Sequence, residues 1–229
     1  MIVFDNVSLH YHYDEYTLLK NLTFSLNEGV NTVLCDVQSG KSSVCKLLTK
    51  EVEPSGGTIT FDGIDISRIT NEGLGILYLS SAPAFFENRS VLYNIAYPLK
   101  VRKINKHARN GIAAKVADNL GITDLSVKVK KLDASERKRI ALARGLTVER
   151  KAVLFDDFFD GTENIEEILN MFSAKIKVIF TSDIQFAQGH CVVLDGGNTE
   201  YTGNAEGAKK SVSSLEWLYN KLTNGQNDD

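Results

Sequence analysis

A phosphate-loop ending, Gly-Lys-Ser, closes the stretch Cys35-Asp36-Val37-Gln38-Ser39-Gly40-Lys41-Ser42-Ser43. In such loops small residues turn backbone N–H groups toward phosphates, a lysine reaches the β- and γ-phosphates, and a Ser or Thr hydroxyl binds Mg²⁺. Cys35 stands where the pattern G-x-x-x-x-G-K-[ST] has its first glycine, so only the second half of the motif is complete. The residues predicted to contact a nucleotide here are Gln38, Ser39, Gly40, Lys41, Ser42 and Ser43.

The flanks of this loop favour nucleotide binding over an ordinary surface turn. Thr32–Leu34 is typical of a short buried strand, and residues 44–50 place Val44, Leu47 and Leu48 at helical spacing. A strand, a loop and a helix in that order bring phosphates to a helix N-terminus, where free amides and the helix dipole favour anions. The sequence therefore predicts a nucleotide site.

Composition and charge narrow the classes of protein. The 229 residues are 43% hydrophobic and 24% charged, with a net charge of −3, which is ordinary for a water-soluble protein and predicts no nucleic-acid partner. The start, Met1–Asp5, lacks the charged and apolar regions of a signal peptide, and no apolar run reaches the roughly 18 residues that cross a bilayer. We expect a cytoplasmic protein that reaches a membrane only through a partner.

The hydrophobic pattern indicates an α/β fold, and together with the Gly-Lys-Ser motif it predicts a P-loop NTPase core. Alternation over residues 2–9 and 18–26 predicts an N-terminal antiparallel β subdomain, and Thr58–Phe61 predicts a further edge strand. The segment from about Phe86 to Arg144 is helical by pattern and predicts an inserted helical subdomain. A mainly parallel sheet, covered on both faces, is predicted by three short apolar runs: Val153–Phe155, Val178–Phe180 and Val192–Leu194.

In their order, these motifs resemble the ATP-binding subunit of ABC transporters over nearly the whole chain. The resemblance rests on residues 19–29, Gly40–Ser43, residues 54–65, Ser90–Leu99, Arg139–Leu146 and Val153–Asp157. It implies one ATP-binding domain over residues 1–229, with residues 1–80 and 140–229 forming the core with its β subdomain and residues 81–139 the helical subdomain.

The resemblance also assigns roles to single residues. Tyr11 lies where the family stacks an aromatic ring on adenine, although a strand tyrosine can also simply pack on the core. Lys41 is expected to bind the phosphates of ATP. Ser42 and Asp156 are expected to hold Mg²⁺, while a carboxylate at this place could also only cap its strand.

Several positions depart from the family pattern. Asp157 replaces the glutamate that polarises the attacking water, and misplacing such a base by about 1 Å can cost about 10²-fold in rate. Ser182 replaces the switch histidine, and Ser81 the glutamine that links the metal to the helical subdomain. Gln38 replaces a loop glycine, at a cost on the order of 1–2 kcal/mol if that position needs positive φ.

The signature segment departs furthest. Leu132-Asp133-Ala134-Ser135-Glu136 stands in place of Leu-Ser-Gly-Gly-Gln, which closes the nucleotide of the opposite subunit. A carboxylate about 4 Å from a phosphate charge is repelled by roughly 4 kcal/mol at an effective dielectric of 20. Asp133 and Glu136 instead have the spacing of a capping box that starts a helix. Glu163, at the position of a family aspartate, also suggests a relaxed dimer interface.

These observations favour an ATP-binding transporter subunit with weak or absent hydrolysis of its own. It would bind ATP and Mg²⁺, pair with a second ABC ATPase subunit, and contact an integral membrane subunit through residues 82–99. The alternative is a soluble regulatory or structural cassette without a transport role. An unrelated P-loop kinase is disfavoured because no substrate lid is evident in the sequence.

Overall fold

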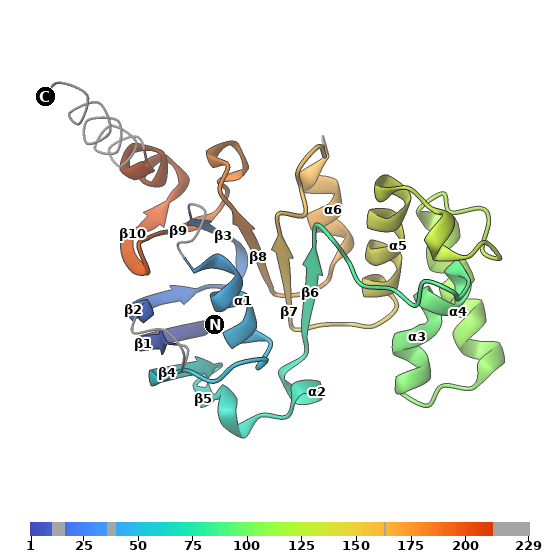
Figure 1. Ribbon diagram of the computed structural model, residues 1–229, viewed down its shortest axis with the longest axis horizontal. Coiled ribbons are helices and arrows are strands. Elements are labelled where there is room, and N and C mark those ends of the chain that lie inside the picture. Colours follow the sequence, from blue (N-terminus) through green and yellow to red (C-terminus); the bar gives the residue numbers. More distant parts are fainter. Residues whose placement is uncertain (11–16, 36–39, 163, 213–229) are drawn as a thin grey trace, which may run out of the picture.

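The computed structural model describes residues 1–10, 17–35, 40–162 and 164–212. The predictions for Tyr11, Gln38, Ser39 and Glu163 lie outside the described residues. Two sheets lie side by side at one end of the molecule, and a group of helices lies at the other (Figure 1). None of the helices in the described ranges combines the length and the apolar character that crossing a membrane requires.

The smaller sheet is antiparallel and confirms the predicted N-terminal β subdomain. Alternating apolar residues such as Ile2 and Phe4 are fully buried on one face, and the ring of Phe4 stacks on Phe24 at 4.4 Å between centroids. This alternation is what an antiparallel sheet with one wet face requires. In spatial order its strands are β2 (Thr17–Leu26), β1 (Ile2–His10), β4 (Gly56–Phe61) and β5 (Ile64–Asp65).

The larger sheet is parallel apart from its edge strand β10. The three apolar runs predicted as buried strands are three of its four inner strands, and all five residues of β7 are buried. In spatial order its strands are β10 (Asn198–Asn204), β9 (His190–Asp195), β3 (Gly29–Cys35), β8 (Ile176–Thr181), β7 (Ala152–Asp156) and β6 (Ile76–Ser80).

Different helices cover the two faces of this sheet. On one face, α1 (Lys41–Leu48) joins a core that it shares with the smaller sheet. On the other face, α5 (Ala134–Leu146) and α6 (Ile165–Met171) pack on Phe155 and Ile179. Short helical segments complete the connections: η1 (Ile66–Arg68), α2 (Asn71–Leu74), η2 (Val129–Lys131) and η3 (Ile184–Phe186).

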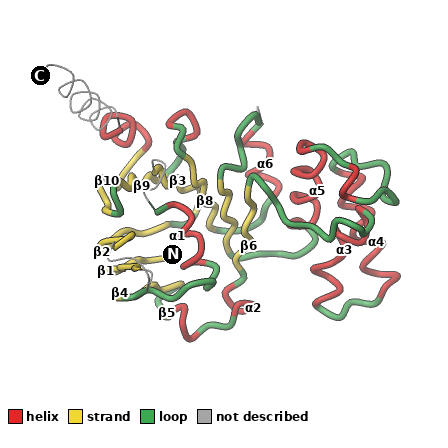
Figure 2. The backbone as a smooth tube through the Cα atoms, in the orientation of Figure 1, coloured by secondary structure: helices red, strands yellow, loops and turns green. Residues whose placement is uncertain are grey.

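The helical lobe packs α3 (Val91–Val101) and α4 (Lys106–Asn119) against α5. Helix α5 belongs to two cores, because Ile140 and Ala143 face the lobe while Ala141 and Leu142 face the sheet. The tube in Figure 2 shows helix and loop in this end of the molecule, away from the strands. The lobe is therefore tied to the sheet through one shared helix.

Three details differ from the sequence predictions. Helix α1 begins at Lys41 rather than at Val44, because Gly40 acts as its N-cap in a left-handed conformation. Strand β4 is not at the edge, since the two-residue strand β5 pairs with it beyond the turn. The pattern analysis missed β6, whose mixed exposure hides the apolar run expected of a parallel strand.

Candidate functional site

The predicted site residues lie at one edge of the parallel sheet. Strands β3, β8, β7 and β6 are neighbours and run in the same direction, so the segments that follow them emerge together. Along the chain, Lys41 comes after β3, Ser182 after β8, and Ser81 after β6. Asp156 is the last residue of β7. In open α/β folds ligands bind at this carboxyl edge.

Gly40 is required both by its conformation and by its neighbours. Its φ is 93°, in the region that glycine tolerates best, and an added Cβ would lie 2.3 Å from Leu19 Cδ2. Its carbonyl accepts hydrogen bonds from the amides of Ser43 and Val44, which starts α1. No acidic residue occupies the first turn, and Gly40 gives no side-chain cap, so this N-terminus is suited to an anion.

Lys41 reaches across this edge to two carboxylates, those of Asp156 at the end of β7 and of Asp157 directly after it. Its ammonium donates a hydrogen bond to Asp157 Oδ2 and lies 3.5 Å from Asp156 Oδ1. The side chains of Lys41 and Asp156 are only 17% and 11% exposed. The predicted convergence of Lys41 and Asp156, from segments far apart in the sequence, is therefore present in the structure.

The charge state of Lys41 follows from this pairing. Burial is the largest single influence on its pKa and lowers it, but the hydrogen bond to Asp157 and the charges of Asp157 and Asp156 together outweigh burial. The pKa of Lys41 is raised above its ordinary value, so the side chain stays cationic at neutral pH. A fixed, partly desolvated cation at this place is what a triphosphate needs.

Asp156 is held in one orientation by its neighbours. The Tyr78 hydroxyl donates a hydrogen bond of 2.6 Å to Asp156 Oδ2, and the backbone carbonyl of Asp156 accepts from the Ser81 amide at 3.0 Å. Among the described residues Oδ1 is buried without a hydrogen-bond partner, so this oxygen has unused capacity as an acceptor or ligand. Burial, first, and the bond to Asp156 raise the pKa of Tyr78 well above its ordinary value, so its hydroxyl remains a donor.

These observations fit ATP with Mg²⁺. The cation of Lys41 and the N-terminal amides of α1 would hold phosphate, and the Ser42 hydroxyl with Asp156 Oδ1 would hold the metal directly or through its water shell. The described residues contain no cluster of three metal-ligating His, Cys, Asp or Glu side chains. That is compatible with Mg²⁺, which binds through one or two protein oxygens together with substrate phosphates. Bound there, Mg²⁺ would neutralise phosphate charge.

Asp157 lies in an unusual backbone conformation beside this pair. Its φ is 45°, and its amide donates to the carbonyl of Phe180 at 3.0 Å. Aspartate is among the residues that accept this left-handed region. Its side chain is 32% exposed and is engaged with Lys41 rather than free to orient a water molecule.

Ser182 and Ser81 are both exposed at the same edge of the sheet. The residues on either side of Ser182 stabilise the turn after β8. Asp183 accepts a hydrogen bond from the Gln185 amide at 2.9 Å, and the Asp183 amide donates to Thr181 Oγ1. Ser182 therefore lies between two residues that serve the local turn. Ser81 contributes its backbone amide to Asp156, not its hydroxyl.

The start of α5 confirms the predicted capping box. Asp133 accepts from the Glu136 amide at 2.8 Å, and Glu136 accepts from the Asp133 amide at 3.0 Å. The next residue, Arg137, forms a bidentate pair with Glu87 at 2.7 Å per contact, which ties α5 to the segment before α3. The polar side chains at this helix start are thus used within the chain.

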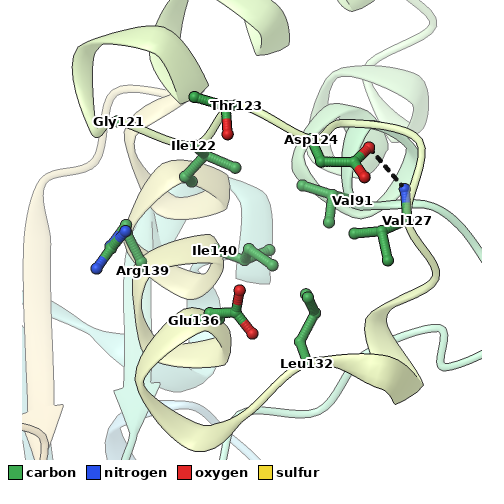
Figure 3. Close-up of a pocket in the computed structure, with 10 residues that line it drawn as sticks. All are labelled: Val91, Gly121, Ile122, Thr123, Asp124, Val127, Leu132, Glu136, Arg139 and Ile140. Carbon is green, nitrogen blue, oxygen red and sulfur yellow. Dashed lines mark hydrogen bonds between the residues drawn. The ribbon is translucent and has the colours of Figure 1, made fainter.

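A separate hollow of about 150 Å³ lies in the helical lobe beside α5 (Figure 3). Glu136 and Asp124 are its two carboxylates, and both already accept backbone hydrogen bonds, Asp124 from Val127 and Ser126. Ile122 and Ile140 form part of its apolar wall. With its carboxylates already engaged, this hollow is a weaker candidate than the sheet edge.

Tyr78 is the site residue that the sequence analysis missed. It lies on β6 two residues before Ser80, whose Cα pairs with that of Asp156. Ile76 on the same side of β6 packs against the core containing α1. Tyr78 could have been found as a hydroxyl-bearing aromatic two residues before Ser80 on one face of a strand. The hydrophobic pattern did not predict β6, so this alternation was not considered.

Comparison with known proteins agrees with this geometry. The ABC transporter family matches residues 19–160, which is more than half of the chain. The chain belongs to the ABC transporter family. The predicted membership and the predicted fold class are both confirmed.

Two curated relatives are molybdate/tungstate import ATP-binding proteins. The one from Thermococcus kodakarensis is 34% identical over 62% of this chain and 43% of its own length. The one from Methanocaldococcus jannaschii is 32% identical over 61% of this chain and 47% of its own length. The matched region thus spans less than half of either relative.

Solved structures with the same fold include cassettes of transporters. A dimeric bacterial ABC transporter cassette, MJ0796, superposes with a TM-score of 0.77 at 20% identity, over 90% of this chain and 99% of its own. The cassette cbiO1 from Clostridium perfringens gives 0.77 at 19% identity, over 97% and 96%. A bacterial Atm1-family ABC exporter with ATP bound gives 0.74 at 22% identity, over 100% of this chain and 42% of that chain.

Proposed function

We propose that this chain is the ATP-binding subunit of a membrane transporter and that it hydrolyses ATP weakly or not at all by itself. The observation that carries the proposal is the placement of Lys41 beside Asp156 at the carboxyl edge of the sheet. Membership of the family supports the proposal that the chain binds ATP, and the positions of Asp157, Ser182 and Asp133 support the proposal of weak hydrolysis.

Weak hydrolysis has a physical basis at each position. Asp157 is paired with Lys41, and its side chain is one methylene shorter than glutamate, so it is a poor base for a water molecule. The Ser182 hydroxyl is too short to replace an imidazole. Asp133 brings negative charge to the segment that in the family closes a partner's nucleotide.

The direct test is to measure binding and turnover on the same purified protein. Isothermal titration should show binding of Mg-ATP, and steady-state phosphate release should be far below that of a competent cassette measured in parallel. An Asp156→Asn variant is the control for binding through the metal. Brisk hydrolysis by the homogeneous chain would overturn the claim of weak turnover, and no binding heat at any Mg²⁺ concentration would overturn the site itself.

We propose pairing with a second ABC ATPase subunit. The dimeric cassette MJ0796 supports such pairing as a property of the fold. In a mixed pair, this chain's Lys41 site would be closed by the partner's intact signature, whereas Asp133 would face the partner's nucleotide. Native mass spectrometry with a second cassette, with and without ATP, distinguishes a mixed pair from a pair of identical chains.

We also propose that a membrane subunit docks on the helical lobe, treated as residues 81–139. Support comes from an aromatic patch formed by Tyr93 and Tyr97 on α3 and by Phe86 in the segment before it. Phe86 is 41% exposed, and its ring lies 4.5 Å from Tyr97 and 5.5 Å from Tyr93. Arg89 and Lys100 each place a cation 5.3 Å from the Tyr93 ring. Such a surface suits an amphipathic helix that carries an acidic residue.

Co-purification tests this docking. A Phe86→Ala, Tyr97→Ala variant should lose a co-purifying membrane subunit while it retains Mg-ATP binding. If ATP binds but no membrane subunit accompanies even the unaltered chain, the soluble regulatory cassette becomes the better account. The names of the two curated relatives make molybdate or tungstate import the first transport to assay.

A further inference from the structure

Tyr78 is placed to control how Asp156 meets a metal. Its hydroxyl holds Oδ2 at 2.6 Å, while the other oxygen, Oδ1, has no hydrogen bond among the described residues and lies 3.5 Å from the Lys41 ammonium. One carboxylate oxygen is therefore occupied, and the other faces the phosphate-binding lysine.

The backbone around this carboxylate is fixed by the sheet. Tyr78 on β6 lies beside β7, with its Cα paired to that of Leu154, and Ser80 pairs with Asp156. The Ser81 amide then bonds to the Asp156 carbonyl. With the main chain held on this side, the remaining freedom of Asp156 is rotation of its side chain, and the Tyr78 hydroxyl restricts that rotation.

We propose that Tyr78 is a positioning residue for Mg²⁺: it fixes Asp156 so that Oδ1 faces the metal that accompanies ATP. This inference rests on the proposed binding of Mg-ATP. Without the hydroxyl, the Asp156 carboxylate would turn toward Lys41 and form a closer ion pair, which competes with the metal. Groups that hydrogen-bond to a metal-holding residue commonly contribute 10–100-fold to metal affinity.

The experiment compares Tyr78→Phe with the unaltered chain by titrating ATP at saturating Mg²⁺ and in EDTA, and then Mg²⁺ at fixed ATP. The phenyl ring keeps the packing of β6 and removes only the donor. We expect apparent Mg²⁺ affinity to fall about 10-fold, at the lower end of the range because Tyr78 is partly exposed. ATP affinity in EDTA should change less than twofold.

Tyr201→Phe is the matched control, because the Tyr201 hydroxyl bonds to Asn204 on β10, at the opposite edge of the sheet from β6. This variant should leave both affinities unchanged. A double-mutant cycle with Asp156→Asn gives a second test. If Tyr78 acts through Asp156, Tyr78→Phe should have little further effect once Asp156 is Asn.

The outcomes separate the two proposals. If the unaltered chain binds no ATP in either buffer, the proposed function fails. If it binds Mg-ATP but Tyr78→Phe leaves the Mg²⁺ dependence unchanged, or weakens binding equally in EDTA, the positioning role of Tyr78 is wrong while the proposed function stands.

Discussion

The N-termini of α1 and α5 differ in how they are capped. At α1 the N-cap is Gly40, which has no side chain to satisfy the first amides, and the nearest cation is Lys41. At α5 the N-cap is Asp133, whose carboxylate satisfies an amide and is joined by Glu136 in a closed reciprocal pair. The N-terminus of α1 has no side-chain cap and is suited to bind an anion from a ligand, whereas the N-terminus of α5 is already capped by the carboxylate of Asp133.

We propose that this contrast lets the chain keep its own nucleotide site while it closes a partner's site poorly. The first backbone N–H groups of a helix have no acceptor within the helix, so a side chain, water or a ligand must accept their hydrogen bonds. In a cassette with serine at the position of Asp133, we expect these amides to remain available to a partner's phosphate. Here Asp133 and Glu136 accept hydrogen bonds from two amides of the chain itself, which stabilises α5. We propose that their negative charge also repels a phosphate. Folding and ligand binding thus compete for the same amides.

The largest effect, on ATP affinity, is expected at the N-terminus of α1. Lys41→Met should weaken ATP binding about 100-fold, because a charged hydrogen-bond donor to phosphate is lost and Asp156 and Asp157 are left without their shared cation. Isothermal titration measures this. Lys46→Met, an exposed lysine on the same helix, is the control and should bind ATP normally. Equal losses in the two variants would mean that Lys41 has no special role.

Turnover should respond to restoring the missing groups. Asp157→Glu combined with Ser182→His is expected to raise phosphate release about 10-fold, since each change returns a group closer to the attacking water. The gain should appear only beside a partner cassette with an intact signature. The assay is steady-state phosphate release of the mixed pair, and no gain there would contradict the assigned positions of both residues.

A smaller effect, on the free energy of unfolding, is expected at the N-terminus of α5. Asp133→Ala removes the cap and should lower the free energy of unfolding by about 1 kcal/mol, or the melting temperature by about 3 °C, without changing ATP binding. Asp133→Ser keeps a capping hydroxyl and should retain most of the stability. Thermal unfolding followed by circular dichroism compares the two. If Asp133→Ala is as stable as the unaltered chain, the capping box does not explain this residue.

The smallest effect is expected where the segment before α3 meets α5. The hydrogen bond from Arg137 holds the pKa of Glu87 below its ordinary value of 4.5. Because the pKa is lower in the folded state, this pair stabilises the fold above about pH 4.5 and the contribution disappears as pH falls through the folded-state pKa. Glu87→Gln should therefore lower the melting temperature slightly at pH 7, and this difference should shrink steadily as the pH falls below 4.5. A difference that grows toward acid would contradict this sign.

Much of this site could be predicted from sequence because it depends on local patterns. Gly40, Lys41 and the buried run ending at Asp156 each carry a signal within a few residues, and parallel strands bring their carboxyl ends together. Asp133 and Glu136 likewise form a contact only three residues apart.

The remainder depends on contacts between distant segments. The bond from Tyr78 to Asp156 joins two strands 78 residues apart in sequence, and no periodicity specifies it. The pairing of Asp157 with Lys41 likewise depends on the positive φ of Asp157, which a sequence pattern does not encode. The charged residues themselves were predicted, but the contacts among them follow only from the assembled sheet.

The most direct test of the account is to identify the nucleotide that stays on the protein. The purified chain would be incubated with radiolabelled ATP and Mg²⁺, separated from free nucleotide, and the bound label resolved by chromatography. The open start of α1 and the altered catalytic positions predict bound label that remains ATP over hours. Recovery of ADP alone would contradict the weak turnover, and recovery of no label would contradict the Lys41–Asp156 pocket itself.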